Sequence, residues 1–270
     1  MKILLSNNDL NEALYDVSNL GYVPTMGSLH KGHISLIKKS LKECKKTIVS
    51  IFINPTQFNN KIDFKNYPRN YMKDLSILKK LKIDFLYIPK FKDIYYLKRK
   101  TLIKLKNEDK ILCAKFRKGH FEGVIDVMER LTKIIKPQKI YMGEKDFQQL
   151  YLVKKYVVLK YNTKIISCKT IRENNKLALS SRNQLLNKNE LVLARKITNE
   201  FFLLKKKLSK SKNVKTLISK KRKELTNSFK INFDYIELRN ASNFKSSNKV
   251  KNSRLFVAYY INKVRLIDNF

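Results

Sequence analysis

Residues 22–33 read Tyr-Val-Pro-Thr-Met-Gly-Ser-Leu-His-Lys-Gly-His, and this stretch decides the fold. Apolar residues over 20–25 predict a short strand, and the apolar spacing after His33 predicts a helix over 31–45. His30 and His33 are three residues apart, so they share a face of the first helical turn. A helix N-terminus offers free N–H groups and a partial positive charge, which suit a phosphate.

Strand-like and helix-like segments continue to alternate over the first two-thirds of the chain. This order predicts a parallel sheet wrapped by helical crossovers. After about residue 172, two Lys-rich helical segments precede three strand-like pieces, which predicts a separate, smaller α+β domain. We place the domains at 1–172 and 173–270. The expected strands are 47–53, 84–88, 140–142, 163–171, 233–239, 255–261 and 264–268, and the further helices are 71–82, 124–135, from about 146, 188–209 and 212–228.

The net charge is +37, from 59 Lys and Arg against 22 Asp and Glu, which by itself would suggest nucleic-acid binding. Mutational drift toward A/T-rich codons would explain both this charge and the rest of the amino-acid composition. Lys, Asn and Ile are abundant, Gly is 6 and Trp is 0, where an average chain of this length has roughly 19 Gly. Because the lysines are spread along the whole chain, we favour drift and expect no nucleic-acid partner.

The cysteines and the apolar runs indicate the cellular compartment in which the protein is expected. Cys44, Cys113 and Cys168 are scattered and form no CxxC, which favours reduced thiols over a disulfide framework or a structural zinc site. No apolar run approaches the ~18 residues that a membrane helix needs, and Ile3-Leu4-Leu5 is too short for a secretory signal. We therefore expect a cytoplasmic protein with no membrane partner.

Five of the six glycines and all three histidines lie in a few clusters. Residues 50–58 end a strand in Asn54 and Gln57, whose amides can hydrogen-bond a polar substrate. Residues 117–123 read Arg-Lys-Gly-His-Phe-Glu-Gly and lead into a helix. At the carboxyl ends of parallel strands, such loops would meet in one ligand crevice.

Two more clusters carry groups that suit a triphosphate. Lys145 lies in residues 141–149 at the start of a helix, where it can contact a phosphate. Residues 179–183 supply two hydroxyls and a guanidinium on a loop. Each cluster alone is more often a cap or a solvated turn. Together and in this order they are hard to explain as accidents.

These blocks resemble the pantoate–β-alanine ligase (pantothenate synthetase) family of the HxGH nucleotidylyltransferase superfamily. The matching residues are 23–33, 50–58, 67–69, 117–124, 143–150, 172–183 and 265–269. The resemblance implies a Rossmann-like domain of the nucleotidylyltransferase type, a smaller C-terminal domain that closes over the site, and a homodimer. Lys118 replaces a family Pro, Leu179 replaces a usual Met, and residues 174–176 replace an Asp-Gly-like turn.

The resemblance also implies the reaction. ATP and pantoate form pantoyl adenylate and pyrophosphate, and β-alanine then gives pantothenate and AMP. Mg²⁺ is expected with ATP, with Asp74 and Asp146 as candidate carboxylates near it, although its ligands stay unassigned. The implied catalytic residues are His30, His33 (treated in the family as the proton donor) and Lys145, and the implied pantoate and β-alanine contacts are Asn54, Gln57 and Gln149. The implied ATP contacts are Met26, Gly27, Ser28, Leu29, His30, Lys31, Gly32, His33, Gly143, Glu144, Lys145, Asp146, Ile171, Leu179, Ser180, Ser181 and Arg182.

Four rivals remain at this point. Another HxGH enzyme could transfer a nucleotidyl group to a different acceptor, but residues 54–58 and 143–150 argue against it. A class I aminoacyl-tRNA synthetase shares the HxGH motif, yet 270 residues leave little room for an anticodon-reading part. A basic RNA-binding protein would show a recognisable motif. A non-catalytic scaffold ranks low because the key polar groups are present.

Overall fold

The computed structural model describes residues 1–59, 61–96 and 103–270. The chain divides into two units, Met1–Thr170 and Ile171–Phe270. The sequence placed the boundary between 172 and 173, so Ile171 and Arg172 lie in the second unit rather than the first.

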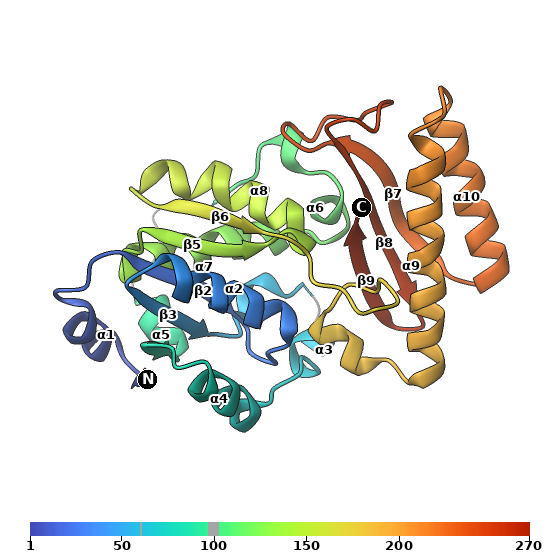
Figure 1. Cartoon of the computed structure of the whole chain (residues 1–270). Helices are drawn as coiled ribbons and strands as arrows, with labels where there is room; N and C mark the ends of the chain where they lie inside the picture. The colour runs from blue at the N-terminus through green and yellow to red at the C-terminus, as the bar shows by residue number, and fades with distance from the viewer. Residues whose placement is uncertain (60, 97–102) are drawn as a thin grey trace. The chain divides into compact units, whose positions relative to one another are not determined.

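Six parallel strands form the sheet of the first unit, in the order β1-β4-β3-β2-β5-β6 (Figure 1). The central strands β2 and β3 are almost wholly buried, as expected for a parallel sheet that is covered on both faces. The predicted α/β fold is confirmed. The strands are β1 (Lys2–Leu4), β2 (Leu20–Thr25), β3 (Lys46–Ile51), β4 (Phe85–Tyr87), β5 (Lys139–Gly143) and β6 (Lys164–Cys168).

Helices flank this sheet, and local sequence explains where they begin and end (Figure 1). For example, the long helix α7 follows Gly119 at φ 79° and ends at Lys136 at φ 52°, just before Pro137, which cannot continue a helix. The helices are α1 (Asn7–Leu14), α2 (Lys31–Glu43), α3 (Lys61–Lys65), α4 (Tyr71–Lys80), α5 (Phe91–Ile94), α6 (Cys113–Phe116), α7 (His120–Ile135) and α8 (Phe147–Tyr156), with 3₁₀ turns η1 (Pro55–Gln57), η2 (Asn107–Asp109), η3 (Glu144–Asp146) and η4 (Val158–Lys160).

Strand β2 lies between β3 and β5 in the sheet. The chain adds β3 and β4 on one side of β2 and then β5 and β6 on its other side. The ladder from β2 to β3 runs as far as Thr25, whereas the ladder from β2 to β5 ends at Tyr22. Pro24 has no N–H to donate, so it cannot extend a ladder by that group. The loops after β2 and β5 therefore leave the sheet at a topological switch point, where open α/β sheets bind ligands.

The second unit is an antiparallel sheet in the order β7-β8-β9 with two helices beside it (Figure 1). Apolar residues of both helices and all three strands share one core. The predicted α+β organisation is confirmed. Its elements are η5 (Ser181–Leu185), α9 (Lys188–Leu208), α10 (Val214–Phe229), β7 (Asn232–Asn240), β8 (Ser253–Ile261) and β9 (Val264–Asn269).

Two elements at the N-terminus were not predicted. Ile3-Leu4-Leu5 is too short for a secretory signal, yet Lys2–Leu4 pairs with β4 as an edge strand. Helix α1 begins with a capping box, in which Ser6 Oγ accepts from Asp9 N and Asp9 Oδ2 accepts from Ser6 N, both at 3.1 Å. The pattern Ser-x-x-Asp was the available signal.

The three cysteines are free thiols. Within residues 1–59, 61–96 and 103–270, every helix is too short or too polar to cross a membrane.

Candidate active site

The loop after β2 has an unusual backbone and a buried carboxylate that fixes it. Gly27 and Ser28 take φ values of 78° and 53°. Asp74, 2% exposed on α4, accepts hydrogen bonds from Ser28 N and Leu29 N, both at 2.7 Å. A left-handed conformation is costly for Ser, so these two bonds help to hold it. Because both Asp74 oxygens accept backbone N–H groups, Asp74 anchors this loop, and its suggested place near a Mg²⁺ ion stays a prediction.

His30 and His33 stand at the N-terminus of α2, with ring centroids 4.1 Å apart. His30 Nδ1 accepts from Gly32 N at 3.1 Å, and His33 Nδ1 accepts from His30 N at 3.3 Å. A ring nitrogen that accepts a backbone N–H carries no proton, so in each neutral imidazole the proton is on Nε2. Both rings therefore present an N–H donor on the side away from the helix backbone.

Burial keeps these two imidazoles neutral. It lowers the pKa of His33 to about 3, with the neighbouring His30 as the next cause. Burial likewise lowers the pKa of His30 to about 4, and the positive charge of Lys145 lowers it further. At pH 7 each ring is a hydrogen-bond donor of zero charge.

Gly32 lets this arrangement form. A Cβ at Gly32 would lie 2.7 Å from His30 Cε1 and 2.9 Å from His30 Nδ1. The imidazole of His30 therefore folds back over a position that only glycine leaves open.

Lys145 and Asp146 follow β5 in the turn η3. Lys145 Nζ lies 3.3 Å from Asp146 Oδ1, and the charges of both act on His30 and His33. The preceding Glu144 accepts a hydrogen bond from Ser167 Oγ on β6 at 2.7 Å. The structure thus brings the predicted His30, His33 and Lys145 together at the carboxyl ends of β2 and β5.

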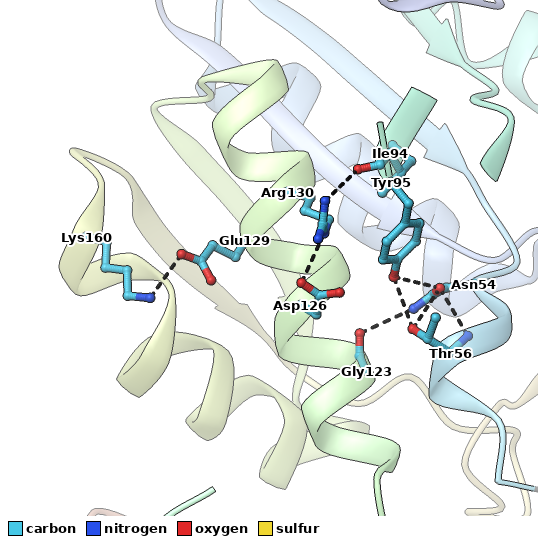
Figure 2. Close-up of polar contacts among 9 residues, drawn as sticks. All are labelled: Asn54, Thr56, Ile94, Tyr95, Gly123, Asp126, Glu129, Arg130 and Lys160. Carbon is cyan, nitrogen blue, oxygen red and sulfur yellow. Dashed lines mark hydrogen bonds and ion pairs between the residues drawn. The ribbon is translucent and has the colours of Figure 1, made fainter. Parts of the chain in front are cut away.

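The amides that follow β3 are buried and differ in their partners. Gln57 Nε2 donates to Met26 Sδ at 2.7 Å, so its amide lies against the loop after β2. Asn54 Oδ1 accepts from Thr56 N, Thr56 Oγ1 and Tyr95 Oη at 3.3, 3.1 and 2.9 Å (Figure 2). Its Nδ2 donates to a main-chain carbonyl oxygen in the first turn of α7. Asn54 is thus turned inward, and its contact with a substrate stays a prediction.

Two neighbouring glutamines on α8 take different environments. Gln148 is buried and holds the segment before α6, because its Oε1 accepts from Cys113 N at 3.0 Å and its Nε2 donates to Ile111 O at 2.7 Å. Gln149, the predicted substrate contact, is half-buried.

The remaining predicted ATP contacts lie in the second unit, on one hairpin and the turn after it. Leu179 N donates to Ile171 O at 3.0 Å, which brings these two residues side by side. Ser180 caps η5, since its Oγ accepts from Arg182 N at 3.3 Å. The hairpin and its turn therefore present Ile171, Leu179 and residues 180–182 as one local group within this unit.

A family model described as pantoate-beta-alanine ligase matches residues 2–270. The chain belongs to the pantoate–β-alanine ligase family. Curated pantothenate synthetases of Flavobacterium psychrophilum and Francisella tularensis subsp. mediasiatica are each 41% identical to it over 268 residues. These alignments cover 96% and 97% of this chain, and 94% and 93% of the relatives.

Solved structures of pantoate–β-alanine ligases agree with this assignment. A pantothenate synthetase of Thermus thermophilus matches with a TM-score of 0.93 and 29% identity, covering 100% of this chain and 99% of that one. A Francisella tularensis pantoate-beta-alanine ligase, solved with beta-gamma ATP and beta-alanine, matches with a TM-score of 0.84 and 39% identity, covering 100% and 97%.

The departures from the pantoate–β-alanine ligase pattern are accommodated. Lys118, in the place of Pro, is exposed in a turn closed by His120 N donating to Arg117 O at 3.1 Å. In the turn at 174–176, the residue in the left-handed conformation is Lys176, at φ 72°. Both turns form without the family residue.

Sequence reasoning missed two sets of supporting groups in this ligase. Asp74 was not recognised as the anchor of the loop after β2, and residues 117–123 were singled out without a role. No local pattern links Asp74 to Ser28, which is 46 residues away. In the described part of the chain, no group of three or more His, Cys, Asp or Glu is arranged to hold a metal ion.

Proposed function

We propose that this chain condenses pantoate with β-alanine to pantothenate, consuming ATP and releasing AMP and pyrophosphate. The observation that carries the proposal is the pair of neutral imidazoles at the N-terminus of α2, beside Lys145, in a chain that matches the ligase family over residues 2–270.

In the first step, a carboxylate oxygen of pantoate attacks the α-phosphorus of ATP, and pyrophosphate leaves. Such a displacement needs alignment of the groups and stabilisation of phosphate charge more than covalent help. His30 and His33 offer Nε2–H donors to phosphate oxygens, and Lys145 adds positive charge. We assign His33 the role of hydrogen-bond donor in preference to proton donor, because burial lowers its pKa to about 3.

In the second step, the amine of β-alanine attacks the acyl carbon of pantoyl adenylate, and AMP leaves with the electrons of the acyl–oxygen bond. Water must be kept away from the adenylate until the amine arrives. We propose that the second unit, Ile171–Phe270, closes over the site for this purpose and that the first unit, Met1–Thr170, holds ATP and pantoate.

The site residues are proposed as follows. Gln57, Gln149 and Asn54 contact pantoate or β-alanine, and Gln57 and Gln149 hold pantoate. The phosphates and the adenosine contact the loop after β2, the turn after β5 and the hairpin group of the second unit, which comprise Met26, Gly27, Ser28, Leu29, His30, Lys31, Gly32, His33, Gly143, Glu144, Lys145, Asp146, Ile171, Leu179, Ser180, Ser181 and Arg182.

Three further features belong to the same proposal. Mg²⁺ enters with ATP, because an ion of this kind needs only one or two carboxylates when phosphates supply the other oxygens. Asp146, which is exposed and lies beside Lys145, could supply such a carboxylate. The ion would offset phosphate charge there. We also propose a homodimer, to be tested by light scattering, and a cytoplasmic location.

The test is pyrophosphate release from ATP in the presence of Mg²⁺. Pantoate alone should give slow or single-turnover release, and added β-alanine should give steady turnover with AMP and pantothenate as products. No release with pantoate under any condition would overturn the proposal and leave an HxGH nucleotide-binding protein with another acceptor.

A further inference from the structure

The third histidine, His120, has no role in the reaction described so far. It is the first residue of α7, it follows Gly119 at φ 79°, and it is 8% exposed. His120 Nδ1 lies 2.6 Å from the carbonyl oxygen of Gln57, and its Nε2 lies 2.9 Å from Arg117 Nη1. Both ring nitrogens are therefore within hydrogen-bond distance of a partner.

The two partners decide where the proton of His120 lies. A guanidinium has only donors and stays protonated, so Nε2 of His120 must accept from Arg117. A carbonyl oxygen can only accept a hydrogen bond, so Nδ1 must donate to the carbonyl oxygen of Gln57. The ring is neutral with its proton on Nδ1, which is the opposite tautomer to that of His30 and His33. Arg117 in turn lies 3.8 Å from Asp63 Oδ2, which helps to orient it.

The same first turn of α7 touches the Thr56–Gln57 peptide at a second point. A Cβ at Gly123 would lie 2.4 Å from Thr56 O, so only glycine allows this approach. Asn54 Nδ2 donates to Gly123 O at 3.2 Å, which also joins the start of η1 to the helix (Figure 2). The main chain of Gln57 is thereby fixed to the start of α7.

We propose that His120 is a positioning residue for pantoate: its Nδ1–H fixes the carbonyl of Gln57, and this sets the side-chain amide of Gln57 against Met26, where the substrate is held. The inference rests on the proposed function, because it takes Gln57 as a pantoate contact. His120 acts through Gln57 and does not touch the reacting atoms.

Two substitutions separate the two hydrogen bonds of His120. The amide of Asn overlaps the Nδ1 side of the ring, so His120→Asn can still donate to Gln57 O. The amide of Gln reaches the Nε2 side, so His120→Gln can still accept from Arg117 but loses the bond to Gln57. The KM values for pantoate and for ATP are measured separately by pyrophosphate release, alongside the melting temperature.

The proposal predicts that His120→Gln raises the pantoate KM about tenfold or more and leaves the ATP KM within about twofold, whereas His120→Asn stays close to the wild type. Equal effects on both KM values, or equal effects of both variants, would overturn the role of His120 while the proposed function stands. A wild-type chain without pantoate-dependent release would overturn the proposed function as well.

A measurement on the unchanged protein guards against variants that do not fold. Nitrogen-15 NMR of the three imidazoles should show His120 protonated on Nδ1, and His30 and His33 protonated on Nε2. If His120 carries its proton on Nε2, or on both nitrogens at pH 7, the positioning bond to Gln57 is absent and the proposal fails.

Discussion

The guanidinium of Arg172 donates two parallel hydrogen bonds to the carboxylate of Asp268, from Nη1 to Oδ2 at 2.6 Å and from Nη2 to Oδ1 at 2.8 Å. Nη1 also donates to Lys176 O at 2.9 Å, and the guanidinium carbon lies 5.1 Å from the Phe270 ring centroid. A single side chain thus ties the hairpin of residues 171–179 to β9, 96 residues further along the chain.

Asp268→Asn should therefore loosen the hairpin that leads into Ser180 and Arg182. Asn offers one acceptor and no charge to a guanidinium that is 19% exposed, so we expect a loss of about 1–3 kcal/mol in unfolding free energy. The KM for ATP should rise more than the KM for pantoate. Pyrophosphate-release kinetics and urea unfolding measure the two effects.

The matched control is Asp234→Asn. Asp234 accepts from Arg265 Nε at 2.7 Å, and the two side chains are 12% and 15% exposed, in the same sheet but in another ion pair. The Asp234→Asn variant should lose about as much stability as Asp268→Asn, but its KM for ATP should not change. If both variants raise the ATP KM equally, the hairpin has no special link to ATP.

Gly32→Ala should damage catalysis without unfolding α2. The added methyl would meet His30 at 2.7 Å, so the imidazole must move, although Ala is the better helix residue by about 1 kcal/mol. We expect kcat/KM to fall by at least about tenfold. Lys38→Ala is the control, because Lys38 is exposed on the same helix and lies outside the proposed ATP contacts, and it should stay active. Equal losses in both variants would contradict this account.

His33→Asn should keep the cap of α2 but lose the donor that faces the phosphates. An Asn oxygen can accept from His30 N as Nδ1 does, whereas nothing replaces Nε2–H. Removing one such donor typically lowers kcat by about 10²–10³. His33→Gln, which carries its amide further out, should recover part of the rate. Full activity of His33→Asn at an unchanged melting temperature would rule out this role.

Elements with a sustained apolar period were predictable from sequence. The helices over 31–45 and 124–135 were expected because their apolar residues repeat at helical spacing, and they form α2 and α7. The strand β1 is only three residues long, so no period exists to detect, and its partner β4 is more than 80 residues away. Strand pairing of that kind is a property of the folded sheet.

The site residues show the same difference between local patterns, which the sequence reveals, and distant contacts, which it does not. His30, His33 and Lys145 lie in local motifs whose residue types suggested phosphate contacts before the fold was known. Asp74 and His120 act through contacts 46 and 63 residues away, on Ser28 and Gln57, and through single backbone atoms. No spacing rule encodes such contacts, so they were found only in the folded chain.

The two lowered histidine pKa values predict how stability changes with pH. In the unfolded chain each histidine titrates near ~6.5, whereas folding lowers the pKa to about 4 for His30 and about 3 for His33. Below about pH 6.5 the unfolded chain binds protons that the folded chain does not, so stability falls as pH falls toward 4. At pH 5 the loss reaches at most about 2 kcal/mol for His33.

His33→Asn isolates this contribution, since the variant shares every other titrating group with the wild type. Its melting temperature should fall less than that of the wild type between pH 7 and pH 5. Parallel curves for the two proteins would show that His33 is protonated equally in the folded and unfolded chains.

The net charge of +37 should make the melting temperature depend on salt. Like charges repel most strongly in the compact state, and raising ionic strength from 0.01 to 0.1 M shortens the screening length from about 30 to about 10 Å. The melting temperature should therefore rise with NaCl. Replacing the exposed Lys215, Lys220 and Lys223 of α10 by Gln should raise it at low salt and reduce its slope with salt. A melting temperature that is flat with salt in both proteins would show that the lysines of the folded surface lie too far apart to repel one another appreciably.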